Sequence, residues 1–323
     1  MYPQSIVRWI RWCLTVLCTL GGLTHLTAQN AKALKSYDPY LIVLGTAQDA
    51  GAPQIGCQKS CCTKRFSDPT LKKQVTSLGI VDPVTGQTFL LEATPDIILQ
   101  NRELQQEIKT NAPLPNGILL THAHIGHYSG LQFLGKEATN ATKIPVYVMP
   151  KMQRFLEENG PWSQLVAEEN IRLVPMTAEV AVQLTPQLKI TPHLVPHRDE
   201  FSETVAYTVE GPNTSVLFIP DIDKWERWST HINAKVSEVD IAFLDATFYN
   251  AEEINNRDIS QIPHPFVIET MKRFEDASDS EKNKIHFIHL NHTNPLLDPN
   301  SDASNYVISN GFRIARKSMK IPL

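Results

Sequence analysis

Three histidines follow directly on a short apolar run, which is the most chemically informative feature of the chain. His122, His124 and His127 come after Ile118-Leu119-Leu120, and only 11 of the 323 residues are histidine. Two histidines at positions i and i+2 of an extended segment point the same way, so both can reach one ion. His127 follows a short turn and could serve a second ion. The spacing favours a metal site at the end of a strand over a polar surface loop with chance histidines.

A cluster of cysteines is a second candidate metal site. Two of the five cysteines, Cys13 and Cys18, fall in a presumed signal segment, which leaves Cys57, Cys61 and Cys62. Three closely spaced cysteines are too few for a disulfide framework and suit a thiolate metal site with one further ligand. The alternative is one disulfide and a free thiol in an oxidising compartment. A bridge between the adjacent Cys61 and Cys62 would be strained.

The first 28 residues are typical of a secretory signal peptide. Arg8 and Arg11 precede an apolar stretch from Trp12 to Leu26, and Ala28 stands at a plausible cleavage point before Gln29. The apolar stretch is about 15 residues long, whereas a spanning helix needs roughly 20. We therefore expect a secreted or periplasmic protein with no stable membrane insertion after signal removal. An uncleaved N-terminal membrane anchor is the alternative.

Charge and composition limit the class of partner. Thirty basic and 34 acidic residues give a formal charge of −4, and the two kinds are interspersed along the chain. This distribution contains no basic stripe and predicts no nucleic-acid partner. Because no Gly/Ser linker, charge run or repeat divides the remainder, we expect one domain over residues 37–323.

Most of the predicted strands end at a side chain that could bind a metal or act as an acid or base. The apolar runs cover residues 40–45, 88–93, 117–120, 189–196, 215–219, 241–244 and 285–288. The side chains that follow include His122, His197, Asp221, Asp245 and His289. Strand ends that meet at one sheet edge are a common way to assemble a site.

Helix-compatible segments lie between these strands, at residues 96–109, 129–138, 150–159, 224–233 and 265–278. Alternation of short buried strands with helices predicts a mixed α/β layered domain. The pair Trp225 and Trp228 could belong to the core or could line a substrate cleft.

Together these residues resemble the signature of the metallo-β-lactamase superfamily, His-x-His-x-Asp-His after a strand, followed by a His, an Asp and a final His. The matching positions are His122, His124, Gly126, His127, His197, Asp221 and His289. The resemblance covers essentially the whole chain after the presumed signal. It implies a four-layer αββα sandwich.

Within that superfamily, residues 44–54, the cysteine cluster and residues 287–295 look most like pyrroloquinoline quinone biosynthesis protein B (PqqB) and the PhnP-like phosphodiesterases of carbon-phosphorus lyase pathways. In those phosphodiesterases, three N-terminal cysteines and a histidine three residues beyond the last active-site histidine hold a structural zinc. The resemblance therefore implies a structural zinc held by Cys57, Cys61, Cys62 and His292, with His289 in the active site. An exchange of roles between His289 and His292 is the alternative.

The resemblance also implies the roles of the active-site residues. His122, His124 and His197 would hold a first ion, and Asp221, which we count as catalytic, would bridge to a second ion held by His127 and His289. Zinc is the expected metal, with iron or manganese as alternatives at the active site. A water bound to such ions has its pKa lowered toward ~7, so neither a serine nor a cysteine nucleophile is needed.

The chain departs from the superfamily pattern at two positions. Gly126 stands where an aspartate is usual, which predicts a weaker or absent second ion, or a turn in which water fills the space. Glu92 stands where a supporting aspartate is common, and its longer side chain has a different reach.

Several other side chains have a candidate role. Arg198 is a candidate catalytic residue that could clamp a phosphate or carboxylate of the substrate; an ion pair with Asp199 or Glu200 is the alternative. Asp245 is predicted to support the site without binding metal. His193, His264 and His286 are predicted to be structural.

These features predict a secreted metal-dependent hydrolase in which metal-bound hydroxide attacks a small ester, lactone or phosphodiester. A first alternative is iron-dependent oxidative chemistry of the quinone-biosynthesis type, against which the presumed signal peptide counts. A second is a non-catalytic protein that binds metal or ligand, which the missing aspartate at Gly126 would support.

Overall fold

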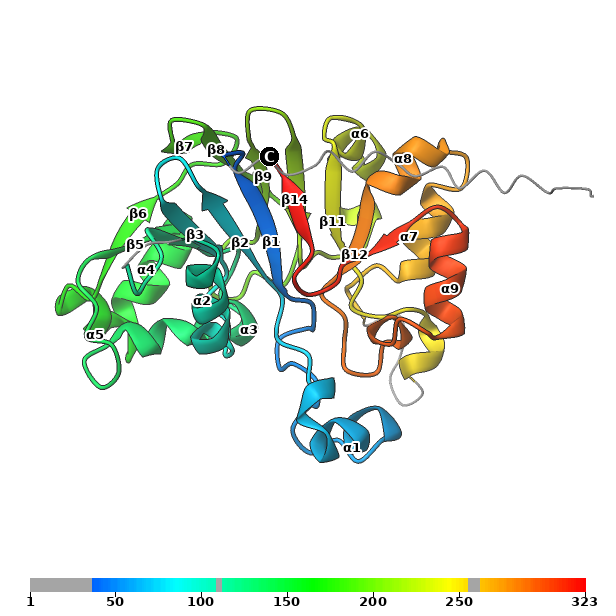
Figure 1. Cartoon of the computed structure of the whole chain (residues 1–323), viewed down its shortest axis with the longest axis horizontal. Helices are drawn as coiled ribbons and strands as arrows, with labels where there is room; N and C mark the ends of the chain where they lie inside the picture. Colours follow the sequence, from blue (N-terminus) through cyan, green and yellow to red (C-terminus); the bar gives the residue numbers. More distant parts are fainter. Residues whose placement is uncertain (1–36, 109–111, 255–261) are drawn as a thin grey trace, which may run out of the picture. The chain divides into compact units, whose positions relative to one another are not determined.

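The computed structural model describes residues 37–108, 112–254 and 262–323, so the predicted signal peptide lies outside the described residues. Two mixed sheets form the centre of this part (Figure 1). In spatial order, the first sheet contains β14 (Lys320–Pro322), β1 (Tyr40–Gly45), β2 (Ser77–Asp82), β3 (Gln87–Leu91), β4 (Gly117–Leu119), β5 (Ile144–Val148) and β6 (Ile171–Pro175). The second contains β13 (Arg313–Ile314), β12 (Ile285–Ile288), β11 (Ile241–Asp245), β10 (Ser215–Ile219), β9 (Val205–Glu210), β8 (Leu188–Leu194) and β7 (Val182–Thr185).

Helices connect the strands. The α-helices are α1 (Ser60–Ser67), α2 (Ile97–Gln106), α3 (Ile125–Tyr128), α4 (Pro150–Glu158), α5 (Trp162–Ala167), α6 (Ile232–Ser237), α7 (Val267–Arg273), α8 (Asp279–Lys284) and α9 (Asp302–Ser309). The 3₁₀ helices are η1 (Pro69–Leu71), η2 (Ser129–Leu134), η3 (Trp225–Arg227), η4 (Ala251–Ile254) and η6 (Pro295–Leu297). Within the described ranges, no helix has the length and apolarity that crossing a membrane requires.

Three layers of apolar side chains hold the sheets and helices together. One layer packs the outer face of the first sheet against α2, α4 and α5, as with Leu90 and Leu156. A second fills the space between the sheets, where Phe89 and Phe218 are fully or almost fully buried. A third packs the second sheet against α6, α7 and α9. Figure 1 shows the same arrangement. The result is the predicted αββα sandwich, in which the strand periodicity of two places alternate side chains in neighbouring layers.

Strand direction brings the functional segments to one edge. β3 and β4 are parallel, and β1 runs the same way because both β1 and β3 are antiparallel to β2. In the second sheet β10, β11 and β12 are parallel, and β8 shares their direction because both β8 and β10 are antiparallel to β9. The loops of the candidate site therefore follow the carboxyl ends of three strands of the first sheet and four of the second, namely β1, β3, β4, β8, β10, β11 and β12.

Three predicted helices differ in the structure. The helix predicted over residues 265–278 covers only Val267–Arg273. Residues 129–138 form a 3₁₀ helix that ends at Leu134. Residues 224–233 contain only the short η3 and the first two residues of α6. The physical reason at η3 is burial of two large side chains with separate partners. Trp225 donates from Nε1 to Thr270 Oγ1 at 2.9 Å, and Trp228 donates to the carbonyl oxygen of Leu194 at 2.9 Å. Both tryptophans belong to the core.

Candidate metal centre

The histidine-rich loop after β4 presents its side chains to loops from both sheets. His124 is the residue before α3, and His127 lies within that short helix. The carbonyl oxygen of His127 accepts a hydrogen bond from the amide of Ala93, which ties α3 to the segment after β3. His122 and His127 are buried, whereas the His124 side chain is 12% exposed and faces the rim.

A first set of donors consists of His122, His124, His197 and Asp221. One donor atom from each lies within 4.8 Å of the others. Asp221 Oδ2 is 3.4 Å from His122 Nε2 and 3.3 Å from His197 Nε2. These are the residues that the resemblance implied for the first ion, now drawn from the ends of β4, β8 and β10.

A second set consists of Asp49, His127, Asp221 and His289, whose donor atoms also lie within 4.8 Å of one another. Asp221 belongs to both sets, in keeping with the bridging role that the resemblance implied. Asp49 comes from the loop after β1 and was not among the predicted residues. The same strand-end reasoning applied to the segment 44–54 could have found it.

In each buried histidine of the two sets, the ring nitrogen Nδ1 lies close to a hydroxyl or a carboxylate group of another side chain. Thr121 Oγ1 lies 2.9 Å from Nδ1 of His122, and Thr247 Oγ1 lies 3.0 Å from Nδ1 of His289. The other two face carboxylates at 3.5 Å, namely Glu92 for His127 and Asp223 for His197. Such contacts fix the tautomer and the ring orientation of metal-binding histidines.

The backbone also shows strain at this edge. Glu92 and His289 have φ angles of 80° and 63°, a left-handed conformation that non-glycine residues seldom adopt. Strain of this kind persists where the surrounding structure determines the residue, and it is common at functional sites.

The electrostatics of the cluster fit a metal ion. Burial lowers the pKa of His197, but the nearby carboxylates of Asp221 and Asp223 raise it to about 9. Burial likewise lowers the pKa of His127, and Glu92 and Asp49 raise it well above its usual range. Buried carboxylates thus favour positive charge in the cluster. Some buried donor atoms, among them both ring nitrogens of His197 and Nε2 of His289, have no hydrogen-bond partner within the described residues. The donor set therefore fits divalent cations.

His264 is a further residue that the sequence did not assign to the site. Its Nδ1 lies 2.9 Å from Asp245 Oδ2 and 3.0 Å from Asp221 Oδ1. Asp245 in turn accepts hydrogen bonds from the amides of Ile222 and Thr247, which matches its predicted supporting position. His264 stands between two prolines rather than at a strand end, so the residues around it gave no indication of this contact.

Two other histidines, His193 and His286, have the structural partners expected of them. His193 contacts Glu179 and Thr208, and His286 contacts the carbonyl oxygen of Lys284.

Arg198 lies beside His197 and is exposed. Neither of its expected ion-pair partners binds it. Asp199 accepts from Thr204 Oγ1 at 2.9 Å, and Glu200 lies 3.4 Å from His124 Nε2. Burial is the largest cause of the lowered pKa of His124, and the charge of Arg198 also lowers it, so the guanidinium acts electrostatically on the rim of the first set.

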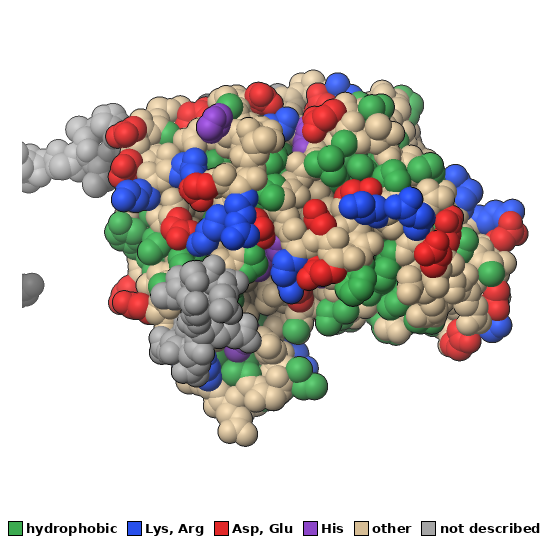
Figure 2. Space-filling model, turned by 180° about the vertical axis from the view of Figure 1, so that it is seen from behind, with side chains coloured by type: hydrophobic (Ala, Val, Ile, Leu, Met, Phe, Trp, Pro, Cys, Tyr) green, Lys and Arg blue, Asp and Glu red, His purple; other side chains and the backbone are tan. Residues whose placement is uncertain are grey.

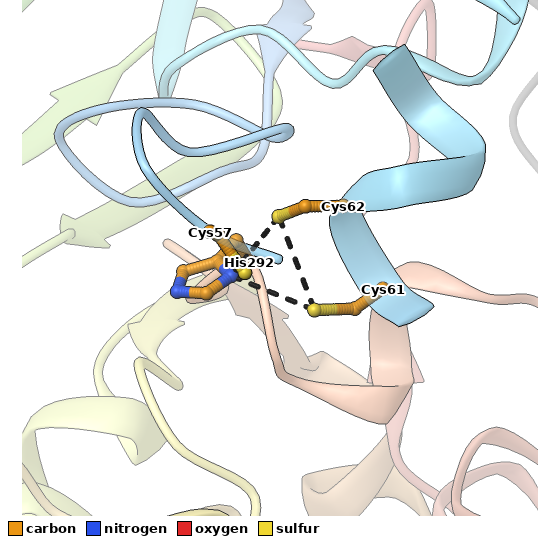
Figure 3. Close-up of side chains that lie close together, drawn as sticks. All are labelled: Cys57, Cys61, Cys62 and His292. Carbon is orange, nitrogen blue, oxygen red and sulfur yellow. Dashed lines mark hydrogen bonds between the residues drawn. The ribbon is translucent and has the colours of Figure 1, made fainter. Parts of the chain in front are cut away.

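The cysteine cluster is separate from these two sets. Cys57, Cys61 and Cys62 are free, and their sulfurs and a ring nitrogen of His292 lie within 4.8 Å of one another (Figure 3). Nδ1 of His292 is 3.6 Å from Cys61 Sγ and 3.3 Å from Cys62 Sγ, and the two sulfurs are 3.9 Å apart. Three thiolates and one imidazole around a tetrahedral zinc would be roughly 3.5–3.8 Å apart. The geometry favours the metal site over the disulfide. It also places His292, not His289, beside the thiols, so the exchanged arrangement does not form.

On the face of the molecule that Figure 2 shows, acidic and basic side chains lie next to one another.

A family model described as "Beta-lactamase superfamily domain" matches residues 87–287. Coenzyme PQQ synthesis protein B of Methylorubrum populi is 23% identical over 307 residues, which cover 88% of this chain and 100% of that protein. The protein of the same name from Xanthomonas campestris pv. campestris is 22% identical over 307 residues, which cover 88% of this chain and 99% of that protein.

Solved structures agree on the fold. Zinc-bound PqqB from Methylobacterium extorquens superposes with a TM-score of 0.72 at 20% identity, covering 88% of this chain and 100% of that one. A diphosphatase of the PhnP family superposes with a TM-score of 0.60 at 21% identity, covering 88% and 97%. Because the family model spans more than half of the chain and the fold agrees, the chain belongs to the β-lactamase superfamily.

Proposed function

We propose that this protein is a metal-dependent hydrolase that acts on a small ester, lactone or phosphodiester. The observation that carries the proposal is the pair of donor sets that meet at Asp221. Its Oδ2 lies 3.4 Å from His122 Nε2 and 3.8 Å from His127 Nε2, so one carboxylate faces both sets. Zinc, iron and manganese all suit such nitrogen and oxygen donors.

Bound metal ions would lower the pKa of a water and polarise the scissile carbonyl or phosphoryl group. The residues of the chain would hold the metal ions and determine from which side a substrate reaches them. His122 and His127 are buried, while His124, Glu200 and Asp49 are partly exposed and mark the open side where a substrate enters. In this proposal Arg198, at the same rim, binds a phosphate or carboxylate of the substrate. The cysteine cluster holds a structural zinc.

The first test replaces a residue of the first donor set. His122→Ala is expected to abolish turnover and to remove metal from the first set, because it deletes a ligand from a buried site. His193→Ala is the matched control, since His193 is buried but bonded to Glu179 and Thr208. The measurements are hydrolysis of a panel of esters, lactones and bis(p-nitrophenyl) phosphate, together with elemental analysis. Full turnover by His122→Ala, or a silent panel with the wild type fully loaded with metal, contradicts the proposal.

Oxidative chemistry is the second candidate, and the full-length similarity to the PQQ synthesis proteins favours it. In that case iron would occupy the histidine sets, and turnover would consume oxygen. Elemental analysis and an oxygen electrode separate the two candidates, since simple hydrolysis requires no oxygen.

We also propose that residues 1–28 are a cleaved signal peptide and that residues 37–323 form a single catalytic domain. The charged residues Arg8 and Arg11 before the apolar stretch support the first statement. N-terminal sequencing of the protein from a periplasmic fraction should begin at Gln29. Recovery of the intact N-terminus in the membrane fraction would support the uncleaved anchor instead.

A further inference from the structure

We propose that Asp49 is the anionic ligand of the second metal ion and takes the place of the aspartate that Gly126 lacks. The inference rests on the proposed metal centre but does not depend on hydrolysis. It changes the expectation drawn from Gly126, because the second donor set keeps a carboxylate of its own besides the shared Asp221.

The contacts of Asp49 point to the second set. Its Oδ1 is 3.1 Å from His127 Nε2 and 3.5 Å from His289 Nε2. Both imidazoles are fully buried, and Nε2 of His289 forms no hydrogen bond within the described residues. Together with Asp221 these atoms lie within 4.8 Å of one another. Two imidazoles and two carboxylates form a donor set that suits zinc, iron or manganese.

The absence of a side chain at Gly126 makes room for Asp49. A Cβ at position 126 would lie 2.4 Å from the Cα of Asp49 and 2.6 Å from its Oδ1. Heavy atoms cannot approach so closely, so a side chain at 126 and the observed position of Asp49 exclude each other. The observed position of the Asp49 carboxylate therefore requires glycine at position 126.

The loop after β1 holds Asp49 in this position. The amide of Gly51 donates to the carbonyl of Gln48 at 2.8 Å, and Gly51 has the positive φ of 70° that this turn requires. The amide of Gln48 donates to the carbonyl of Leu290 at 2.9 Å, which ties the turn to the neighbour of His289. Gln48 Nε2 donates to Asp49 Oδ2 at 3.2 Å, so Oδ1 is the oxygen left for the histidines.

The test measures metal content and affinity. Wild-type protein equilibrated with zinc should contain three ions per chain, one for the cysteine cluster and one for each donor set. Asp49→Asn keeps the shape of the side chain but removes its charge, and it should contain two. Supporting groups of metal ligands are worth about 10- to 100-fold in affinity, so loss of the ligand itself should weaken the second ion by about 100-fold or more. Zinc titration against a chromophoric chelator measures the dissociation constant.

Two further variants isolate the cause. Gly126→Ala leaves the carboxylate intact but displaces it, and should lose the same ion. Glu200→Gln removes an equivalent charge from the rim near His124, which belongs to the first set, and should leave the affinity of the second ion unchanged. The zinc of the cysteine cluster, retained in every variant, confirms that the fold is intact.

The inference is overturned if Asp49→Asn retains the third ion with unchanged affinity. It is also overturned if Glu200→Gln loses the ion to the same extent, or if the wild type never binds a third ion. A wild type that holds three ions without hydrolysing any ester or phosphodiester would overturn the proposed function and leave this inference standing.

Discussion

Glu92 and Asp223 are carboxylates that face the remote nitrogens of two histidines in the candidate centre. Glu92 is fully buried and its Oε1 lies 3.5 Å from Nδ1 of His127. Glu92 Oε2 accepts a hydrogen bond from the amide of Thr121 at 3.4 Å, which fixes the carboxylate against the histidine-rich loop. Its longer side chain therefore does reach a histidine of the second set, and the left-handed backbone at Glu92 sets its direction. Asp223 faces His197 in the same way.

Glu92→Gln should weaken the second ion by about 10- to 100-fold without unfolding the protein, because the amide keeps a similar size but no longer strengthens His127 as a ligand. Zinc titration of the purified variant measures this change. The first ion serves as the internal control, since His122 is supported by Thr121 instead. Equal weakening of both ions would show that Glu92 acts on the fold in general.

Residue types and spacing predicted most of the centre but not all of it. His122, His124, His127, His197, Asp221 and His289 come together as the resemblance implied. Asp49 follows a predicted strand and could have been found by strand-end reasoning, but its close approach to Gly126 exists only in space, between residues far apart in sequence. His264 had no such signal, since a loop rather than a strand end delivers it to Asp245.

Two segments each connect the cysteine cluster to the second donor set. After β1 the chain carries Asp49 and Cys57 in a loop and then Cys61 and Cys62 in α1 (Figure 1). The segment after β12 carries His289 and, three residues later, His292. Hydrogen bonds between Gln48 and Leu290 and between Leu290 and Thr46 join the two segments. A zinc ion in the cysteine cluster would therefore cross-link the two elements that supply Asp49 and His289.

Cys61→Ser should reduce the affinity of the second donor set although Cys61 belongs to the other cluster. Loss of the cross-link frees both segments, so the second ion pays an additional ordering cost on binding. We expect the cluster zinc to be lost, the second ion to bind less tightly and the first ion to be retained. Zinc titration distinguishes the affinities of the three ions. The control is Ser60→Ala, which lies one residue earlier, at the start of α1. An unchanged second ion in Cys61→Ser would show that the hydrogen bonds alone hold the two segments.

Half of the strands could be predicted at this scale. Of the fourteen strands in the described residues, the sequence indicated seven, and β2, β5, β6, β7, β9, β13 and β14 were not predicted. Each apolar run that the sequence indicated forms a strand, because burial on both faces demands continuous apolar residues. The segment 224–233 is not one helix, since two tryptophans find separate hydrogen-bond partners in the core. Local helical propensity is weak beside the burial of two large aromatic side chains.

The two sheets are held together by an apolar layer and also by Leu323. β14 pairs with β1 in the first sheet, and the amide of Leu323 donates to the carbonyl of Pro39 at 2.8 Å. On the other side, a Cβ on Gly211, which lies between β9 and β10 of the second sheet, would be 2.4 Å from Leu323 Cβ. The fully buried Leu323 thus contacts both halves of the sandwich.

Leu323→Ala should therefore destabilise the whole molecule, by about 3 kcal/mol of unfolding free energy, which is the usual cost of deleting a buried leucine side chain and leaving a cavity. Leu99→Ala is the matched control, because Leu99 is 57% exposed, and it should change stability by less than about 0.5 kcal/mol. Urea unfolding of the metal-loaded proteins measures both. Because Leu323 contacts both sheets, their unfolding should shift together to lower urea concentration in one transition. A loss no greater than that of the control would show that the apolar layer alone couples the sheets and therefore holds the two sides of the metal centre in register. Separate transitions would contradict the expected single transition, because they would show that the sheets unfold independently in the variant.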